Sequence, residues 1–383
     1  MKRWRVAFLA TLTAGAQSIP MPGPGMCAQA SNGYAHHLIF TFNVHPNSNL
    51  IAFPNLISGT YAGMADTGHG GYVTHTTTLN GRTVPADLIF TSDSAGSTLL
   101  SWEIESWSNA TGAIVAWVKA DRSSSADTLI YAWVGKASVT TYQCTASATW
   151  DSNTIAVWHF DDNAASTAVL DAKGSLGGTA QHNTSTLTAG GLMGSAFLET
   201  SSDYVSLPTI TLTGATYAFT SSTWVKFTGG DGSMTLFGFR DSGGNPIWNM
   251  LLGFNGSAGG MAIPSMLVRD NAGNGLTFLN CPSSPQLNDG AWHYVVATRD
   301  SSKNLTLYGD GASCVTGTDT MGTGSTFTLP NIGYEAKDSS HRVYVGYLDE
   351  ARLSSINRSA DWIAHEYRQQ SQSSAWYTVG SWL

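Results

Sequence analysis

The sequence predicts an all-β protein that consists of two antiparallel β-sandwich domains and one short C-terminal helix. Three observations support this fold class. Short runs of β-branched and aromatic residues recur along the chain, and Gly, Asn, Asp and Ser bound them as they bound the strands of antiparallel sheets. Only one segment, near the C-terminus, has the pattern of a good helix. A length of 383 residues suits two domains.

The N-terminus has the pattern of a secretory signal peptide. A basic start is followed by an apolar run at residues 6–14, which is too short to span a membrane. Small residues allow cleavage after Ala16 or after Ala30, and both positions stay open. We therefore assign residues 1–30 to a signal peptide and leader, and we expect the protein to be secreted, extracellular or located at the cell surface.

The composition limits the partners that the protein can have. Charged residues make up only 11% of the chain, and the formal net charge is −8 at pH 7. An acidic chain without a cluster of Lys and Arg does not bind nucleic acid or anionic membranes through bulk electrostatics. No apolar stretch after the leader reaches the length of a membrane span. We therefore expect no nucleic-acid partner and no membrane span.

Residues 31–150 are expected to form the first β-sandwich domain. Turns rich in Asn, Gly and Ser separate its strands, and no amphipathic helix interrupts them. The predicted strands are Leu38–Phe42, Ala86–Thr91, Leu100–Trp107, Ala113–Val118 and Thr128–Val134.

Two glutamates in this domain raise the question of catalysis. Glu103 and Glu105 are two residues apart on a predicted strand, so both side chains lie on one face. Paired carboxylates of this kind act as nucleophile and acid in glycosidases. The third carboxylate that such enzymes carry on the same strand is replaced by Trp107. The favoured interpretation is a solvent-facing strand edge, opposite the apolar face of Trp102 and Ile104.

Residues 151–370 are expected to form the second β-sandwich domain. Its predicted strands again alternate or run apolar between turn residues. They lie within the segments Thr154–Asp162, Gly194–Leu198, Asp203–Leu207, Phe219–Lys226, Asp289–Thr298, Leu305–Gly311 and Val343–Leu353.

The motifs in these segments resemble those of LamG-like domains, which are concanavalin A-like jelly rolls. The opening strand ends in the pattern W-x-F-x-D at residues 158–162. The closing strands read D-G-x-W-H-x-V at 289–295, L-x-L-Y-x-D-G at 305–311 and G-x-L-D-E-x-R-L at 346–353. The motifs occur in the order of the family and cover nearly all of the second domain. This resemblance implies a fold and does not by itself name a ligand.

The first domain is similar to a family of unknown function that often precedes LamG-like domains in exported bacterial proteins. The segments that carry this resemblance are Phe53–Gly59, Asp87–Asp93, Trp102–Trp107 and Trp150–Asn153. It implies an extracellular setting and a partnership with the second domain, but no known chemistry.

A helix is expected at Ser359–Arg368. Ser359 can cap its N-terminus, and Ile363 and Tyr367 form an apolar i,i+4 pair that can pack on the sandwich. The C-terminal tail at residues 371–383 is polar apart from a few aromatic and apolar residues, which allow a last strand on either domain.

Asp349 is the residue for which the strand pattern makes the most specific prediction. On a regular strand it shares a face with the apolar Tyr347, Ala351 and Leu353, while Glu350 points the other way as an exposed partner of Arg352. A bare carboxylate on an apolar face costs several kcal/mol, so Asp349 needs a cation or several hydrogen-bond donors.

The resemblance to LamG-like domains implies one compensating cation, namely a structural calcium ion. Relatives often bind calcium where the acidic end of the opening strand meets this closing strand. By that resemblance, Asp349 together with Asp161 or Asp162 would supply oxygen ligands for Ca²⁺. The alternative is that Asp349 is a structural acid that accepts hydrogen bonds from backbone or Trp N–H groups. Of the histidines, His159 and His293 lie on strands in aromatic surroundings and are expected to be structural.

Four cysteines are too few for a disulfide scaffold. Cys281 and Cys314 flank two neighbouring strands, so they can form a disulfide in an exported protein, or both can be buried small hydrophobic residues. Cys144 is left unpaired if Cys27 is removed with the leader.

These observations favour a non-catalytic protein that binds a glycan or a surface protein through its LamG-like domain, as in adhesion. Two alternatives stay open. The protein could be a structural subunit of a surface or a fibre, including a phage or virion component, or a glycoside hydrolase or lyase of concanavalin fold that uses Glu103 and Glu105.

Overall fold

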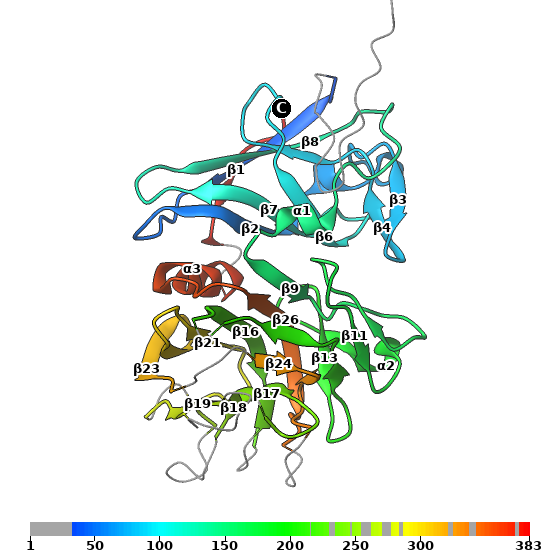
Figure 1. Cartoon of the computed structure of the whole chain (residues 1–383). Coiled ribbons are helices and arrows are strands. Elements are labelled where there is room, and N and C mark those ends of the chain that lie inside the picture. The colour runs from blue at the N-terminus through cyan, green and yellow to red at the C-terminus, as the bar shows by residue number, and fades with distance from the viewer. Residues whose placement is uncertain are drawn as a thin grey trace, which may run out of the picture.

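The computed structural model describes residues 33–214, 216–229, 234–245, 247–253, 262–269, 277–282, 286–320, 325–336, 342–371 and 375–383. The predicted signal peptide and leader, including both cleavage positions, lie outside these residues. The described part is all-β, with two stacked sandwich domains and a short C-terminal helix between them (Figure 1). This confirms the predicted fold class. Within the described part, no helix is both long and apolar enough to cross a membrane.

The first domain is a sandwich of a four-stranded and a three-stranded antiparallel sheet with its own core. The first sheet has the order β27-β1-β8-β5, formed by β1 (His36–Phe42), β5 (Ile89–Thr91), β8 (Thr128–Val134) and β27 (Thr378–Val379). The second has the order β2-β7-β6, formed by β2 (Leu50–Thr60), β6 (Ser101–Trp107) and β7 (Ala113–Arg122). Smaller elements are η1 (Ala62–Met64), η2 (Thr67–His69), the hairpin of β3 (Thr76–Leu79) and β4 (Arg82–Pro85), and α1 (Ala146–Thr149).

The C-terminal tail belongs to the first domain. Strand β27 pairs with β1 through Val379 and Phe40, and Trp376 and Tyr377 are buried in the core of the first domain. The sequence allows a last strand on either domain, and the structure shows this strand on the N-terminal sandwich.

The second domain packs two larger antiparallel sheets around one apolar core. The outer sheet has the order β10-β11-β14-β25-β17-β18-β19-β20, formed by β10 (Ala168–Val169), β11 (Gly178–Ala180), β14 (Val205–Ser206), β17 (Met234–Arg240), β18 (Ile247–Leu252), β19 (Pro264–Arg269), β20 (Thr277–Asn280) and β25 (Leu329–Ile332). The interface sheet has the order β12-β13-β26-β16-β21-β22-β23, formed by β12 (Thr188–Gly190), β13 (Ser195–Glu199), β16 (Phe219–Lys226), β21 (His293–Arg299), β22 (Asn304–Gly309), β23 (Ala312–Thr318) and β26 (Gly346–Ser354). Strand β9 (Thr154–Trp158) also pairs with β26, β15 (Ile210–Leu212) pairs with β24 (Ser325–Phe327), and α2 (Thr184–Leu187) precedes β12.

The two domains share an apolar interface because strands on both sides are apolar on both faces. In β7, Ile114, Ala116 and Val118 point into the core of the first domain, whereas Val115 and Trp117 point toward the second. These residues pack against apolar side chains on the outward face of the interface sheet, which include Trp224, Tyr294 and Val296. A sheet that is covered on both faces reads as a nearly continuous apolar run, as β7 does.

Helix α3 (Ala360–Ser371) lies between the two domains (Figure 1). The backbone N–H of Trp362 donates to the Ser359 hydroxyl at 3.1 Å, which confirms the predicted cap. Gln369 then joins the helix to β2, since its side chain donates to the carbonyl of Pro54 at 2.9 Å and accepts from the N–H of Leu56 at 3.1 Å. The helix therefore closes the second domain and docks on the first.

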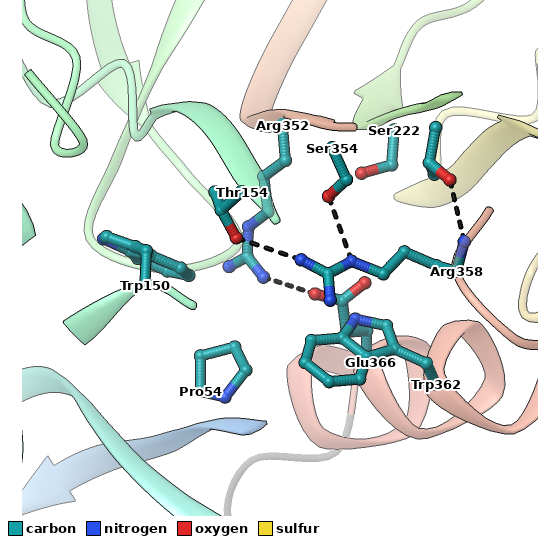
Figure 2. A pocket seen from close by; sticks show the side chains of 10 residues that line it. Pro54, Trp150, Thr154, Ser222, Arg352, Ser354, Arg358, Trp362 and Glu366 are labelled. Atoms are coloured by element: carbon teal, nitrogen blue, oxygen red, sulfur yellow. Dashed lines mark hydrogen bonds and ion pairs between the residues drawn. The ribbon is translucent and has the colours of Figure 1, made fainter. Parts of the chain in front are cut away.

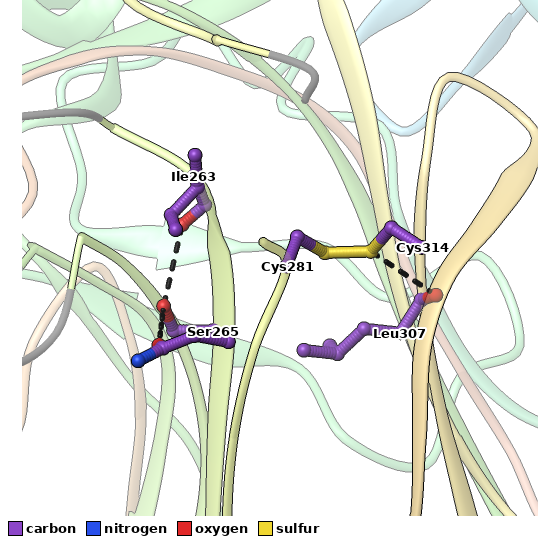
Figure 3. Close-up of a disulfide and its surroundings, with 6 residues drawn as sticks. Ile263, Ser265, Cys281, Leu307 and Cys314 are labelled. Atoms are coloured by element: carbon purple, nitrogen blue, oxygen red, sulfur yellow. Dashed lines mark hydrogen bonds between the residues drawn. A yellow bond between two sulfur atoms is a disulfide. The ribbon is translucent and has the colours of Figure 1, made fainter. Parts of the chain in front are cut away.

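Cys281 and Cys314 are joined by a disulfide in the second domain (Figure 3). Their Cα atoms lie 5.3 Å apart, and the bridge closes a loop with a sequence separation of 33 residues. Cys144 is not a free thiol in this structure. The expected unpaired Cys144 refers to the chain after removal of the leader with Cys27 and stays a prediction.

We predict that replacing both Cys281 and Cys314 by serine lowers the free energy of unfolding by about 2–4 kcal/mol, because the bridge restricts the unfolded chain. Urea unfolding of the full chain, followed by tryptophan fluorescence, measures this change. A matched Ser313→Ala variant on the exposed face of β23 should unfold like the parent protein. Equal midpoints for the parent and the double variant would contradict the predicted contribution.

We also predict that acid weakens the contact between α3 and the first domain. His365 is 1% exposed and packs against Phe53 and Trp376. Burial and the cations of Arg122 and Arg368 lower its pKa to about 3. The unfolded chain takes up a proton near pH 6.5 that the folded chain does not, so stability falls as the pH drops below that value. Between pH 6.5 and 5 the loss in the free energy of unfolding from this residue should be about 2 kcal/mol.

Urea unfolding at these two pH values tests the role of His365. A His365→Phe variant should lack that part of the loss, and an identical loss in both proteins would refute the assignment.

Candidate functional site

Two β-bulges face each other across the domain interface, and each carries a glutamate. In β6 the register against β7 shifts between Ile104 and Ser106, which leaves Glu105 as the extra residue. In β26 the register against β16 shifts where Ser222 pairs with Arg352 and Trp224 pairs with Asp349, and Glu350 has a φ of 50°. A bulge re-aims side chains relative to a regular strand. Here both bulges bring carboxylates into the interface.

His159, which follows β9, lies between these two glutamates. Its Nδ1 contacts Glu350 Oε1 directly and lies 3.6 Å from Glu105 Oε2. Its Nε2 lies 3.4 Å from Glu103 Oε2. The indole N–H of Trp117 donates to Glu105 Oε2 at 2.8 Å, and that of Trp150 donates to Glu103 Oε2 at 2.9 Å. All of these carboxyl and imidazole groups are buried.

Arg352 supplies a cation to this buried cluster. Its guanidinium donates to Glu350 Oε2 at 2.5 Å and to Glu366 Oε1 of α3 at 2.7 Å. The same group lies over the rings of Trp117 and Trp150, at 4.4 and 4.8 Å from the ring centroids. Arg352 therefore holds together groups from β7, β26, α3 and the segment between the domains through ion pairs and cation–π contacts.

Arg82 supplies a second cation from the first domain. It pairs with both carboxylate oxygens of Asp161 and also donates to the backbone carbonyl of Glu105 at 2.5 Å. This ion pair crosses between β4 and the residues that follow β9, so it adds a further polar connection between the domains.

The protonation of the cluster follows from burial and neighbouring charges. Burial raises the pKa of Glu105 well above its usual range, and the charge of Glu350 adds to this effect. Burial opposes ionisation of Glu350 too, but His159 and Arg352 outweigh it and hold its pKa below the usual value. Burial alone would lower the pKa of His159, yet the carboxylates of Glu350 and Glu103 raise it well above its usual value. The ionised pair at the centre is therefore His159 with Glu350.

The structure corrects the predicted exposure of three glutamates. Glu103 and Glu105 do share the face opposite Trp102 and Ile104, but this face is the domain interface and not a solvent-facing edge. Glu350 is fully buried, and it pairs with Arg352 inside the interface and not on the surface. The first domain and α3 cover these positions, and a strand pattern read for each domain alone does not include that cover.

The structure also corrects the predicted strand phase around Asp349. Leu348, Ala351 and Leu353 all point into the core of the second domain, because the bulge at Glu350 shifts the alternation by one residue. Asp349 is buried, but it does not share the face of Ala351 and Leu353. Its Oδ2 accepts the backbone N–H groups of Leu192 and Met193 at 2.8 and 3.2 Å.

The three predicted calcium ligands have other partners in the described part of the chain. Asp161 is paired with Arg82, both oxygens of Asp162 accept the N–H of Leu170 at 3.2 Å, and Asp349 accepts the two N–H groups of the 191–194 loop. Among the carboxylate oxygens of these three aspartates, only Asp349 Oδ1 is buried without a hydrogen-bond partner. Among the described residues, the group whose ligand atoms all lie within 4.8 Å of one another is instead Glu105, His159 and Glu350. In this structure the carboxylates of Asp349, Asp161 and Asp162 are therefore not gathered as one group of ligand atoms, and the calcium site stays a prediction.

Among the described residues, the space enclosed beside Arg352 and Glu366 is small. A cavity of about 20 Å³ lies beside Arg352 and Glu366, with Trp150, Arg358 and Trp362 among its lining residues (Figure 2). This volume holds about one water molecule. A sugar ring does not fit into it.

An open groove of about 490 Å³ lies elsewhere on the second domain. Its side chains are either apolar or hydroxyl-bearing, and none of them is charged. They belong to Ile155, Ser175, Leu176, Thr209, Ile210, Thr211, Leu212, Thr213, Tyr217, Ala218 and Ser355. The volume lies within the usual range for small-ligand sites. No sequence motif marks this groove, because four separate segments of the chain form it.

We predict that Arg352→Ala lowers the free energy of unfolding by about 3–5 kcal/mol, because it leaves Glu366 buried without its cation and leaves Glu350 with His159 alone. The control is Arg368→Ala, which removes an exposed arginine from α3 and should change stability by no more than about 0.5 kcal/mol. Urea unfolding measures both. Equal effects of the two substitutions would show that the buried pair does not hold the interface.

Comparisons with known proteins give a small set of distant similarities. Among curated proteins, none matches this chain. The chain is similar to the solved receptor-binding domain of botulinum neurotoxin D, with 14% identity, a TM-score of 0.43, and coverage of 57% of this chain and 53% of that one. It is also similar to the ligand-binding domain of botulinum neurotoxin serotype D in complex with N-acetylneuraminic acid, with 15% identity, a TM-score of 0.40 and coverage of 59% and 53%. The binding domain of Paraclostridial Mosquitocidal Protein 1 is similar at 13% identity, with a TM-score of 0.39 and coverage of 57% and 52%. The chain thus spans about half the length of these solved structures.

A family model matches the C-terminal part of the chain. Residues 199–364 match the model described as the concanavalin A-like lectin/glucanases superfamily. The matched segment includes most strands of both sheets of the second domain and the start of α3, and it does not include residues 31–150. The C-terminal part of this chain therefore has a concanavalin A-like fold, and its residues 199–364 are similar to that superfamily.

Proposed function

We propose that this protein is a non-catalytic, secreted or surface-associated binding protein whose concanavalin A-like domain binds a neutral glycan. The observation that carries the proposal is the open groove of about 490 Å³ with its hydroxyl-bearing and apolar side chains. Neutral sugars present hydroxyl groups and apolar ring faces, so a lining of this kind can pair with both. The superfamily that the second domain matches includes lectins by its own description.

The chemistry of the lining favours a neutral ligand over a charged one. Thr209, Thr211 and Thr213 contribute hydroxyl groups from β15 and its flanks, and Tyr217 forms part of the same wall. The ring of Tyr217 is backed by Arg299, whose guanidinium lies 4.1 Å from the ring centroid. An ionic ligand would find no charged side chain of opposite sign in this lining.

The burial of Glu103 and Glu105 supports a binding role over a glycosidase. Both carboxyl groups lie in the domain interface, where tryptophan N–H groups hold them, and the adjoining cavity holds about one water molecule. A polysaccharide would have to separate the two domains to reach these groups. The groove, by contrast, is open, and its lining contains no carboxylate.

We predict that Thr211→Arg, which places a long cationic side chain in the groove, weakens glycan binding by at least about 10-fold, a loss of about 1.4 kcal/mol. A glycan array first identifies a ligand for the parent protein, and calorimetry then compares the variants. Thr316→Arg on β23 is the matched control, because Thr316 is also an exposed strand threonine but lies away from the groove. We expect the control to bind like the parent.

Two results would contradict the proposal. An array on which the folded full-length chain binds no glycan above background would contradict the proposal that its ligand is a glycan. Unchanged affinity of the Thr211→Arg variant would place the binding site outside the groove.

A further inference from the structure

We propose that Glu105, His159 and Glu350 form a site for a divalent transition-metal ion that joins the two domains. Their candidate ligand atoms all lie within 4.8 Å of one another. Glu105 comes from β6 of the first domain, whereas His159 and Glu350 come from the second. A metal ion held here would have ligands from both domains.

The arrangement of the imidazole fits metal binding through Nδ1. This atom lies beside Glu350 Oε1 and 3.6 Å from Glu105 Oε2. The other ring nitrogen, Nε2, lies 3.4 Å from Glu103 Oε2, and Trp150 holds that carboxyl group by a 2.9 Å hydrogen bond. A carboxylate beside the free nitrogen of a ligating histidine fixes the orientation of its ring in many metal sites.

Hydrogen-bond donors that are not among the proposed ligands hold both glutamates in place. Trp117 donates to Oε2 of Glu105, and Arg352 donates to Oε2 of Glu350. Oε1 of Glu105 is buried and has no hydrogen-bond partner. A buried carboxylate oxygen without a donor is costly, and a metal ion would compensate it.

The charges of the cluster also leave room for a cation. Five carboxyl groups take part in its contacts, namely Glu103, Glu105, Asp161, Glu350 and Glu366. Three cationic side chains face them in the described structure, namely Arg82, Arg352 and the protonated His159, and a metal ion on Nδ1 would replace the proton of His159. Arg82 is engaged by Asp161, and Arg352 by Glu350 and Glu366, so Glu105 has neither arginine on its carboxylate.

The ligand set indicates which metal would bind. Two carboxylates and one imidazole suit Zn²⁺, Mn²⁺ or Co²⁺, whereas Ca²⁺ prefers six to eight oxygen ligands. The proposed site therefore differs in both residues and chemistry from a calcium site on Asp349, Asp161 and Asp162. Because its ligands come together only when the domains pack, metal affinity would be coupled to domain packing.

The test uses the full chain after dialysis against EDTA and then against metal-free buffer. Addition of Zn²⁺ or Mn²⁺ should give about one bound ion per chain by elemental analysis and should raise the melting temperature by about 5 °C or more. Co²⁺ should produce a visible d–d absorption band of a site with nitrogen and oxygen ligands. This spectrum tests the parent protein directly, so the result does not depend on the folding of a variant.

Glu105→Gln and His159→Gln should each weaken metal binding by at least about 10-fold while retaining much of the side-chain volume. His293→Gln is the matched control, because His293 also lies between two carboxylates, with Asp289 at 3.0 Å and Asp310 at 2.8 Å, but outside the interface. The control should bind metal like the parent. No uptake of Zn²⁺, Mn²⁺ or Co²⁺ by the parent, equal uptake by Glu105→Gln, or loss of uptake only in His293→Gln would each overturn the proposal.

Discussion

The contact of His159 with two bulged glutamates, Glu105 and Glu350, is the interaction on which the arrangement of the domains depends. A buried charge must be compensated where it lies, and these three groups come from both domains. If the domains separated, Trp117 and Trp150 would lose their cation–π contacts with Arg352, and a broad apolar surface would meet water. The polar cluster therefore sets the register of the domains, while the apolar residues around it supply most of the favourable free energy of contact.

Much of the fold could be predicted from the sequence because most strands obey the local rules. Alternation and turn residues located the strands around Trp102, Trp224 and Trp158, and a single serine at the correct position predicted the cap of α3. The concanavalin A-like motifs lie on strands β21, β22 and β26 of one sheet. Local rules succeed there because the face of a strand that turns inward is decided within its own domain.

The candidate site was harder to predict for two physical reasons. A β-bulge shifts the alternation by one residue without any change in composition, so Asp349 and Glu350 were assigned to the wrong faces. Burial of Glu103 and Glu105 depends on a second domain that no local pattern describes. One signal was available: β7 carries apolar residues on both faces, at Val115 and Trp117 as well as at Ala116, which is unusual for a sheet with a solvent face.

The proposed glycan groove and the domain interface share the same pair of strands. On β9, Ile155 lines the groove, whereas Val157 two residues later lies in the apolar interface and His159 follows it into the polar cluster. Ser355, which also lines the groove, directly follows β26, and β26 carries Glu350 and Arg352. A ligand in the groove would therefore bind to a wall whose backbone is fixed by the interface. A second domain that stood alone would leave Val157 on the outward face of β9 and Asp161 after its end without their cover from the first domain. The first domain therefore stabilises the strand on which the groove is built.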